Sequence, residues 1–202
     1  YEAGNLTLAA KEFRAGAETN DVSCQYNLAL MYEQGLGMAK DEKEALNWYR
    51  KAAELGNANA QFNLGVLYEN GRGTAVNFAE ANKWYRRAAV QGDALAVGNL
   101  GMLYLRGDGV KTNKVAGIAL LLQSVTMDNS PENFAKRNIS SAQGLTPEII
   151  TAAQELSTEM GEAKNLLLPL DKYLDGARTN SPSLIVTNAV AAPDTNIVAN
   201  PK

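Results

Sequence analysis

Few residues in this chain could do chemistry, and histidine is absent altogether. Without histidine the chain cannot form a Ser-His-Asp triad, a Cys-His nucleophile pair or a zinc site of the His-Glu-x-x-His type. The single cysteine, Cys24, has no histidine to activate it and no second cysteine with which to form an intramolecular disulfide. We therefore interpret Cys24 as a buried packing residue, which is the usual role of a free cysteine.

Carboxylates gather at Asp41, Glu42 and Glu44, where a general acid–base pair is conceivable. They stand at the expected start of a helix, where the helix dipole favours negative charge, so a structural role is the simpler interpretation. Trp48 and Trp84 could stack on a ligand, but their equivalent places in a repeat indicate packing. The sequence thus predicts no catalytic residue, metal or cofactor, and a chain that is not an enzyme. A repeat-fold hydrolase is the disfavoured alternative.

Three Gly-x-Gly segments could in principle cradle a phosphate. They lie at 35–37, 71–73 and 107–109. A dinucleotide-binding loop follows a strand and has a third glycine, whereas a P-loop ends in Gly-Lys-Ser/Thr. The three segments match neither kind of loop. We expect these glycines to reverse the chain between two helices at positive φ.

The chain repeats itself with a period of 36 residues. Segment 27–37 aligns with 63–73 and 99–109, and segment 48–53 aligns with 84–89. A period of this length is typical of helical solenoids. Within the second unit, apolar and small residues fall at helical spacing and predict two helices. These residues are Ala60, Leu64, Leu67 and Tyr68, then Ala81, Trp84, Tyr85 and Ala88.

This pattern resembles the Sel1-like repeat family, a relative of the tetratricopeptide repeats. The second unit, 57–92, matches both family elements, Ala-x-x-x-Leu-Gly-x-x-Tyr-x-x-Gly-x-Gly and Ala-x-x-Trp-Tyr-x-x-Ala-Ala-x-x-Gly. The first unit, 21–56, has Cys24 and Ala29 in place of the alanine and the glycine. The third unit, 93–128, keeps its first helix but lacks the Trp-Tyr and Ala-Ala pairs. The resemblance implies an all-α, right-handed superhelical solenoid of α/α repeats with C-terminal capping helices.

Helical segments are also predicted on both sides of the three units. Residues 1–20 are predicted to be the later part of a repeat, in which a first helix ends near Gly4 and a second helix follows it. A helical cap over 129–175 should contain helices at 131–142 and 147–160.

The C-terminal part of the chain changes character after the cap. A last cap helix is predicted over 162–175, and Pro169 should end or kink it. Residues 176–202 lose helical periodicity and contain three prolines, so we predict an extended tail. The tail should be mobile in a monomer unless it docks onto its own chain or a neighbouring one.

Composition excludes two classes of protein. The net charge of -3 argues against nucleic acid as a partner, because nucleic-acid binding needs a clustered basic face. No run of eighteen uncharged apolar residues is present, so no transmembrane helix is predicted. The first residue is Tyr1, so a signal peptide could have been removed. The resemblance implies a bacterial protein that is exported, for example periplasmic, with a cytoplasmic location as the alternative.

The face of each first helix that lies opposite its core residues is the predicted binding surface. In tetratricopeptide-like solenoids this face lines the concave groove, and the resemblance implies the same here. The predicted partner-binding residues are Tyr26, Leu30, Glu33, Gln34, Phe62, Val66, Glu69, Asn70, Met102, Leu105 and Arg106. Contiguous apolar surface with a polar rim often marks a binding site. We call the six apolar members the apolar strip, namely Tyr26, Leu30, Phe62, Val66, Met102 and Leu105.

The alternative, in which neighbouring first helices bury Leu30, Val66 and Met102, stays open at this point. The predicted function is a protein-interaction module that binds a partner protein through its concave face. One alternative is a bacterial immunity protein that occludes a cognate secreted toxin, such as a type VI lipase effector. Another is self-assembly through the tail. The sequence alone specifies neither the partner nor the oligomeric state.

Overall fold

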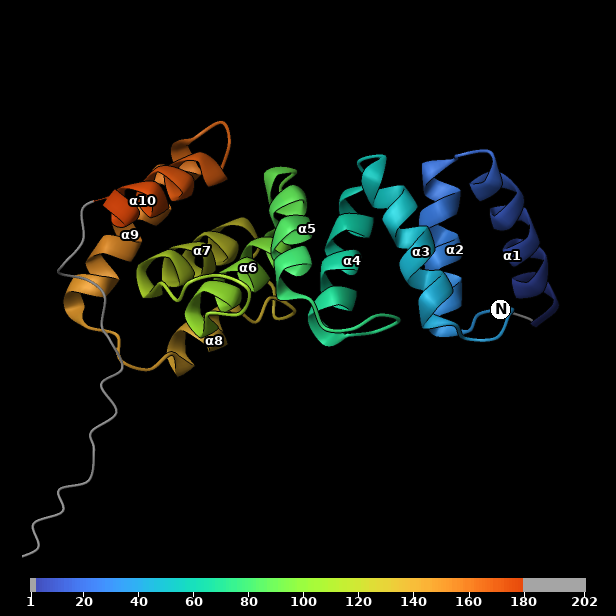
Figure 1. Cartoon of the computed structure of the whole chain (residues 1–202), viewed down its shortest axis with the longest axis horizontal. Helices are drawn as coiled ribbons and strands as arrows, with labels where there is room; N and C mark the ends of the chain where they lie inside the picture. The colour runs from blue at the N-terminus through green and yellow to red at the C-terminus, as the bar shows by residue number, and fades with distance from the viewer. Residues whose placement is uncertain (1–2, 180–202) are drawn as a thin grey trace, which may run out of the picture.

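The computed structural model describes residues 3–179 of the chain, and over this range every regular element is an α-helix. The helices follow one another along one long axis, from α1 at one end to α9 and α10 at the other (Figure 1). The described helices are α1 (Ala3–Glu18), α2 (Val22–Gln34), α3 (Glu42–Glu54), α4 (Ala58–Asn70), α5 (Phe78–Val90), α6 (Ala94–Arg106), α7 (Lys114–Met127), α8 (Ala135–Ser141), α9 (Pro147–Glu162) and α10 (Leu167–Thr179). None of these helices combines the length and hydropathy that a membrane span requires.

Three helix pairs form the repeat units, with α2, α4 and α6 as first helices and α3, α5 and α7 as second helices. Each helix packs against its neighbours along the chain. All six helices begin in the same way, because a capping side chain accepts a hydrogen bond from the backbone N–H three residues later. The caps are Asp21, Asn57 and Asp93 for the first helices, and Asp41, Asn77 and Asn113 for the second helices.

The Gly-x-Gly turns have the predicted positive φ. Gly71 ends α4 with a φ of 68°, and its N–H donates to the carbonyl of Leu67. Gly73 follows with a φ of 70°, and a Cβ added to it would lie 2.2 Å from the carbonyl oxygen of Glu42. The turn of one unit therefore rests on the start of the second helix of the unit before it. Only glycine allows both the backbone conformation and this close approach.

The core consists of the residues that the repeat predicts. Leu64 and Tyr85 are fully buried, and Tyr68 is 9% exposed. Gly65 lies directly against the ring of Tyr85, because an added Cβ would lie 2.6 Å from Cε1 of that ring. The absence of a side chain at Gly65 on the first helix thus leaves room for the ring of Tyr85 between the two helices of the unit.

The third unit loses the Trp-Tyr signature because its second helix is covered on its outer side. Lys43 and Lys51 are exposed on α3, whereas the equivalent residues of α7, Val115 and Gln123, are buried. Helix α9 packs against α7 and covers that side. A charged outer face would be costly there, so α7 is apolar nearly all round.

The N-terminal segment differs from the prediction. Helix α1 continues without interruption from Ala3 to Glu18, so Gly4 lies inside it rather than at the end of an earlier helix. The 36-residue period places Phe13 at the position of Tyr49, which identifies α1 as a second helix of the preceding unit. The expected second helix is thus present, and no turn precedes it within the described residues.

The first helix of the cap begins later than predicted, at Ala135 rather than Pro131. The cause is Asn133, which is buried at the end of α7. Its carboxamide donates to the backbone oxygens of Ser124 and Asp128, and its oxygen accepts from the N–H of Ala135. This side chain fixes an irregular connection where helical periodicity alone predicts a helix.

The prediction that Pro169 ends or kinks a helix is wrong. Helix α10 begins at Leu167, so Pro169 lies in its first turn, where its missing N–H is not needed for an intrahelical bond. The helix then continues through Thr179, so residues 176–179 of the predicted tail are helical. The rest of the predicted tail, 180–202, lies outside the described residues.

One single-residue prediction also needs correction, and it concerns the cysteine. Cys24 is partly exposed rather than buried, although the equivalent Ala60 is fully buried. Cys24 packs against Gly16 of α1, and no described helix lies beyond α1 to complete the burial. Both tryptophans pack as predicted. Trp84 is buried, and Trp48 is half-buried against the core, with the ammonium of Lys51 lying 3.7 Å from its ring centre.

Candidate functional site

The six residues of the apolar strip lie on the three first helices α2, α4 and α6. Each is half-buried and packs on one side against the core. Leu30, Val66 and Met102 therefore keep part of their surface accessible, and the neighbouring helices do not bury them fully. The strip is a surface that remains partly open over three successive units.

Two aromatic residues of the strip rest on buried tyrosines. The ring of Tyr26 lies 5.9 Å from that of Tyr49, and the ring of Phe62 lies 6.0 Å from that of Tyr85. Both supporting tyrosines are fully buried. Such tilted aromatic pairs add packing energy beyond area burial, so the positions of Tyr26 and Phe62 are well fixed. The equivalent residue of the third unit is Gly98.

The predicted glutamates are already bonded within the chain. Glu33 accepts a hydrogen bond of 2.6 Å from the hydroxyl of Tyr49, and Glu69 accepts one of 2.7 Å from the hydroxyl of Tyr85. Burial, with the adjacent carboxylates, raises the pKa of both tyrosines. Glu69 also lies 3.5 Å from the guanidinium of Arg106. These two carboxylates therefore bond to the buried tyrosines on which Tyr26 and Phe62 pack. Direct contact of Glu33 or Glu69 with a partner stays a prediction.

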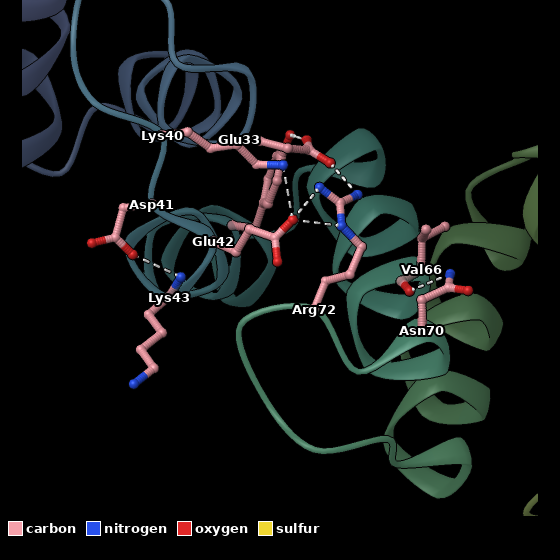
Figure 2. Close-up of polar contacts among 9 residues, drawn as sticks. Glu33, Lys40, Asp41, Glu42, Lys43, Val66, Asn70 and Arg72 are labelled. Atoms are coloured by element: carbon pink, nitrogen blue, oxygen red, sulfur yellow. Dashed lines mark hydrogen bonds and ion pairs between the residues drawn. The ribbon is translucent and has the colours of Figure 1, made fainter.

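A charge-balanced network joins the first unit to the second. Arg72, in the turn after α4, donates to Glu33 at 2.8 Å and to Glu42 at 3.0 Å (Figure 2). Lys40 pairs with Glu42 at 3.1 Å, and hydrogen bonds from Lys40 and Arg72 lower the pKa of Glu42. Asp41 accepts from the backbone N–H groups at the start of α3. Asp41 therefore caps α3, and Glu42 ties the start of α3 to the turn after α4.

The most accessible members of the predicted site lie at the ends of the first helices. Gln34, Asn70 and Arg106 are exposed. Asn70 folds back along its own helix, where its Nδ2 donates to the carbonyl of Val66 at 2.9 Å (Figure 2). These three residues form a polar rim beside the apolar strip.

Two repeated features escaped prediction from the sequence. The amides of Asn63 and Asn99 lie beside the buried tyrosines Tyr49 and Tyr85, where they oppose the rise in the tyrosine pKa values. Their recurrence with the 36-residue period was a usable signal. The second feature is an arginine on the second helix that reaches the next first helix, as when Arg50 donates to the hydroxyl of Tyr68 at 2.9 Å.

The comparisons with known proteins agree with this architecture. A model of the Sel1 repeat matches residues 22–57, 58–93 and 94–129, which is more than half of the chain. The chain belongs to the Sel1 repeat family. Repeats of this family are generally protein–protein interaction modules in non-enzymatic scaffolds. Among the described residues, no cluster of three His, Cys, Asp or Glu side chains is placed to hold a metal ion.

Two solved structures show the same fold. The crystal structure of a Sel1 repeat protein from Oxalobacter formigenes has a TM-score of 0.57 and 30% identity, covering 89% of this chain and 70% of that one. A protective antigen present in uropathogenic Escherichia coli strains, which displays an SLR fold, has a TM-score of 0.54 and 26% identity. That alignment covers 88% of this chain and 45% of the antigen chain. No curated protein matches the sequence.

Proposed function

We propose that this Sel1 repeat chain binds a partner protein across the face that α2, α4 and α6 leave open. The observation that carries the proposal is the apolar strip, which stays half-open over three units while its aromatic members rest on buried tyrosines. A preorganised apolar surface binds with little ordering cost. Because the strip is already rigid, Phe62 is the expected anchor residue, as buried aromatics often are in interfaces.

The charges beside the strip favour a partner surface that is mostly uncharged. Glu33 and Glu42 are balanced by Arg72 and Lys40, and Glu69 is balanced by Arg106. Charges that are paired before binding need no new partner when water is excluded. Affinity should then come from the apolar strip, and the amides of Gln34 and Asn70 should supply orientation at its rim.

Occlusion of a secreted toxin by an immunity protein would use this same face, and so would any other partner of matching shape. None of the described contacts favours a toxin, so the proposal remains at the level of a partner protein. An exported, periplasmic location stays part of the proposal and rests on the family resemblance alone.

A binding test of this proposal uses exposed residues whose replacement should spare the fold. The double variant Gln34→Arg, Asn70→Arg places two charges on the exposed rim of the strip. We expect the free energy of unfolding to stay within about 0.5 kcal/mol of the unchanged chain, as is usual for surface substitutions. Partner affinity should fall at least about tenfold, because a long charged side chain must lose water at the interface. A pull-down from an extract of the native organism identifies the partner, and titration of that partner measures the loss.

The matched control carries the same two charges on the outer side of the solenoid. Asn47 and Ala79 are exposed residues of the second helices α3 and α5, so Asn47→Arg, Ala79→Arg adds equal charge away from the strip. The control should retain the partner. If the control loses the partner while the rim variant keeps it, the binding face is the outer one and the proposal is wrong.

A further inference from the structure

A second surface lies where the C-terminal cap meets the second repeat unit. Helix α10 contacts α5, and a shallow hollow opens between them. Its lining includes Gln61, Arg86, Arg87, Val90, Leu167 and Asp171. The hollow therefore offers two guanidinium groups, amide groups and the exposed side chain of Val90, whereas Leu167 beside it is 2% exposed and belongs to the core. It is separate from the apolar strip.

One arginine of the hollow, Arg86, has a different partner from its equivalents in the earlier units. Arg14 and Arg50 donate to the hydroxyls of Tyr32 and Tyr68 in the following first helix. Arg86 holds the equivalent position on α5, but it donates to both carboxylate oxygens of Asp171 on α10, at 2.5 and 2.6 Å. A carboxylate of the chain itself is thus already bound at one side of the hollow.

The neighbouring Arg87 is held in place by an aromatic ring, but no described carboxylate forms an ion pair with it. Its guanidinium lies 4.6 Å from the ring centre of Trp84, which fixes its position by a cation–π contact. Among the ion pairs of residues 5–176, none involves Arg87. Arg86, Arg87 and Asp171 together leave one positive charge in the hollow without a counter-charge.

The remaining lining favours a peptide over a small free anion. Val90 is 51% exposed at the edge of the hollow and offers an apolar contact beside Arg87. In the same lining, Gln91 donates to the side-chain oxygen of Gln61 at 2.7 Å, and Gln61 in turn donates to the carbonyl of Ala53. The Gln61 amide in the lining is thus held by two hydrogen bonds before any ligand arrives, which lowers the ordering cost of binding.

We infer that the hollow between α5 and α10 is a docking site for a peptide segment that carries a carboxylate beside an apolar side chain. Arg87 binds the carboxylate, since a guanidinium matches the two carboxylate oxygens. Val90, which is exposed at the edge of the hollow, contacts the apolar side chain. The site is independent of the apolar strip, so a partner could be held at both surfaces at once, and avidity would then strengthen binding.

Calorimetric titration with two short peptides tests this inference. The probe is acetyl-Leu-Glu-Leu-Glu-amide, and its chemical control is the peptide with Gln in place of Glu. We expect the Glu peptide to bind and the Gln peptide to bind at least about tenfold more weakly, because a charge-assisted hydrogen bond is lost. Arg87→Gln should weaken the Glu peptide by a similar factor.

The chain offers a matched control for this variant. Lys51 is the equivalent of Arg87 one unit earlier, is exposed and lies over Trp48, but α10 packs against α5 and not against its helix α3. Lys51→Gln removes the same charge and should leave peptide binding unchanged. Equal weakening by both variants would mean general charge attraction rather than a site. Equal binding of the two peptides, or binding of neither, would also contradict the inference, and each outcome leaves the strip proposal unaffected.

Discussion

Replacement of Tyr85 by alanine is expected to lower the free energy of unfolding by about 3–5 kcal/mol, the range found for buried aromatic truncations. Tyr85 is fully buried in the central unit, and its ring supports Phe62 and lies against Gly65. Its loss leaves a cavity and removes the hydroxyl that donates to Glu69. Urea denaturation followed by circular dichroism measures the change.

Tyr85→Phe is the matched control, because it keeps the ring and removes only the hydroxyl. We expect a smaller loss of about 1–3 kcal/mol, since Glu69 then loses one partner in a partly buried place. The two variants separate packing from hydrogen bonding. If Tyr85→Ala cost less than Tyr85→Phe, packing of the ring would not hold the unit together, and our account of the core would fail.

The second large effect is expected at Gly73. An alanine Cβ there would lie 2.2 Å from the carbonyl oxygen of Glu42, a backbone atom that cannot rotate away. The residue also has a φ of 70°, which costs L-residues about 1 kcal/mol or more. Because the clash adds to this strain, we expect Gly73→Ala to destabilise the chain by about 3 kcal/mol or more. Thermal and urea unfolding both measure it.

Gly56 provides the control for the backbone contribution. Its φ is 95°, and nothing lies within 4 Å of the position that a Cβ would occupy. Gly56→Ala therefore introduces conformational strain without a clash, and it should cost about 1–2 kcal/mol. Equal losses at Gly56 and Gly73 would show that contact between the turn and α3 contributes nothing to stability.

The repeated part of the fold could be predicted because one local pattern recurs in register. The same caps, turns and small residues recur at intervals of 36 residues, so each unit supports the assignment of the next. The core positions Leu64, Tyr68 and Tyr85 follow from helical spacing within a unit. The match to the Sel1 repeat model confirms the family.

The cap could not be predicted in the same way because its contacts are not periodic. Asn133 fixes an irregular connection through bonds to Ser124 and Asp128, and α9 covers α7 from outside the repeat. The pairing of Arg86 with Asp171 joins residues far apart in sequence. Neither propensity nor spacing indicates such long-range partners.

The sequence predicted which face of the first helices stays partly open, and binding at that face stays a prediction, but it missed the hydrogen bonds of the polar residues there. Helical geometry placed Phe62 and Val66 on the side away from the core, and both are half-exposed there. It did not indicate that Glu33 and Glu69 bond to buried tyrosines. Phe62 itself packs on Tyr85, so a charge at Phe62 would disturb packing as well as binding. For that reason the binding tests use exposed rim residues.

Site-specific photo-crosslinking tests the central claim most directly. A photoreactive phenylalanine analogue is placed at Asn70 on the rim of the strip in one variant and at Ala79 on the outer side of α5 in another. Both positions are exposed, so neither probe should disturb the core. We predict a crosslink to the captured partner from position 70 and none from position 79. A crosslink from position 79 alone would contradict binding across the face of α2, α4 and α6.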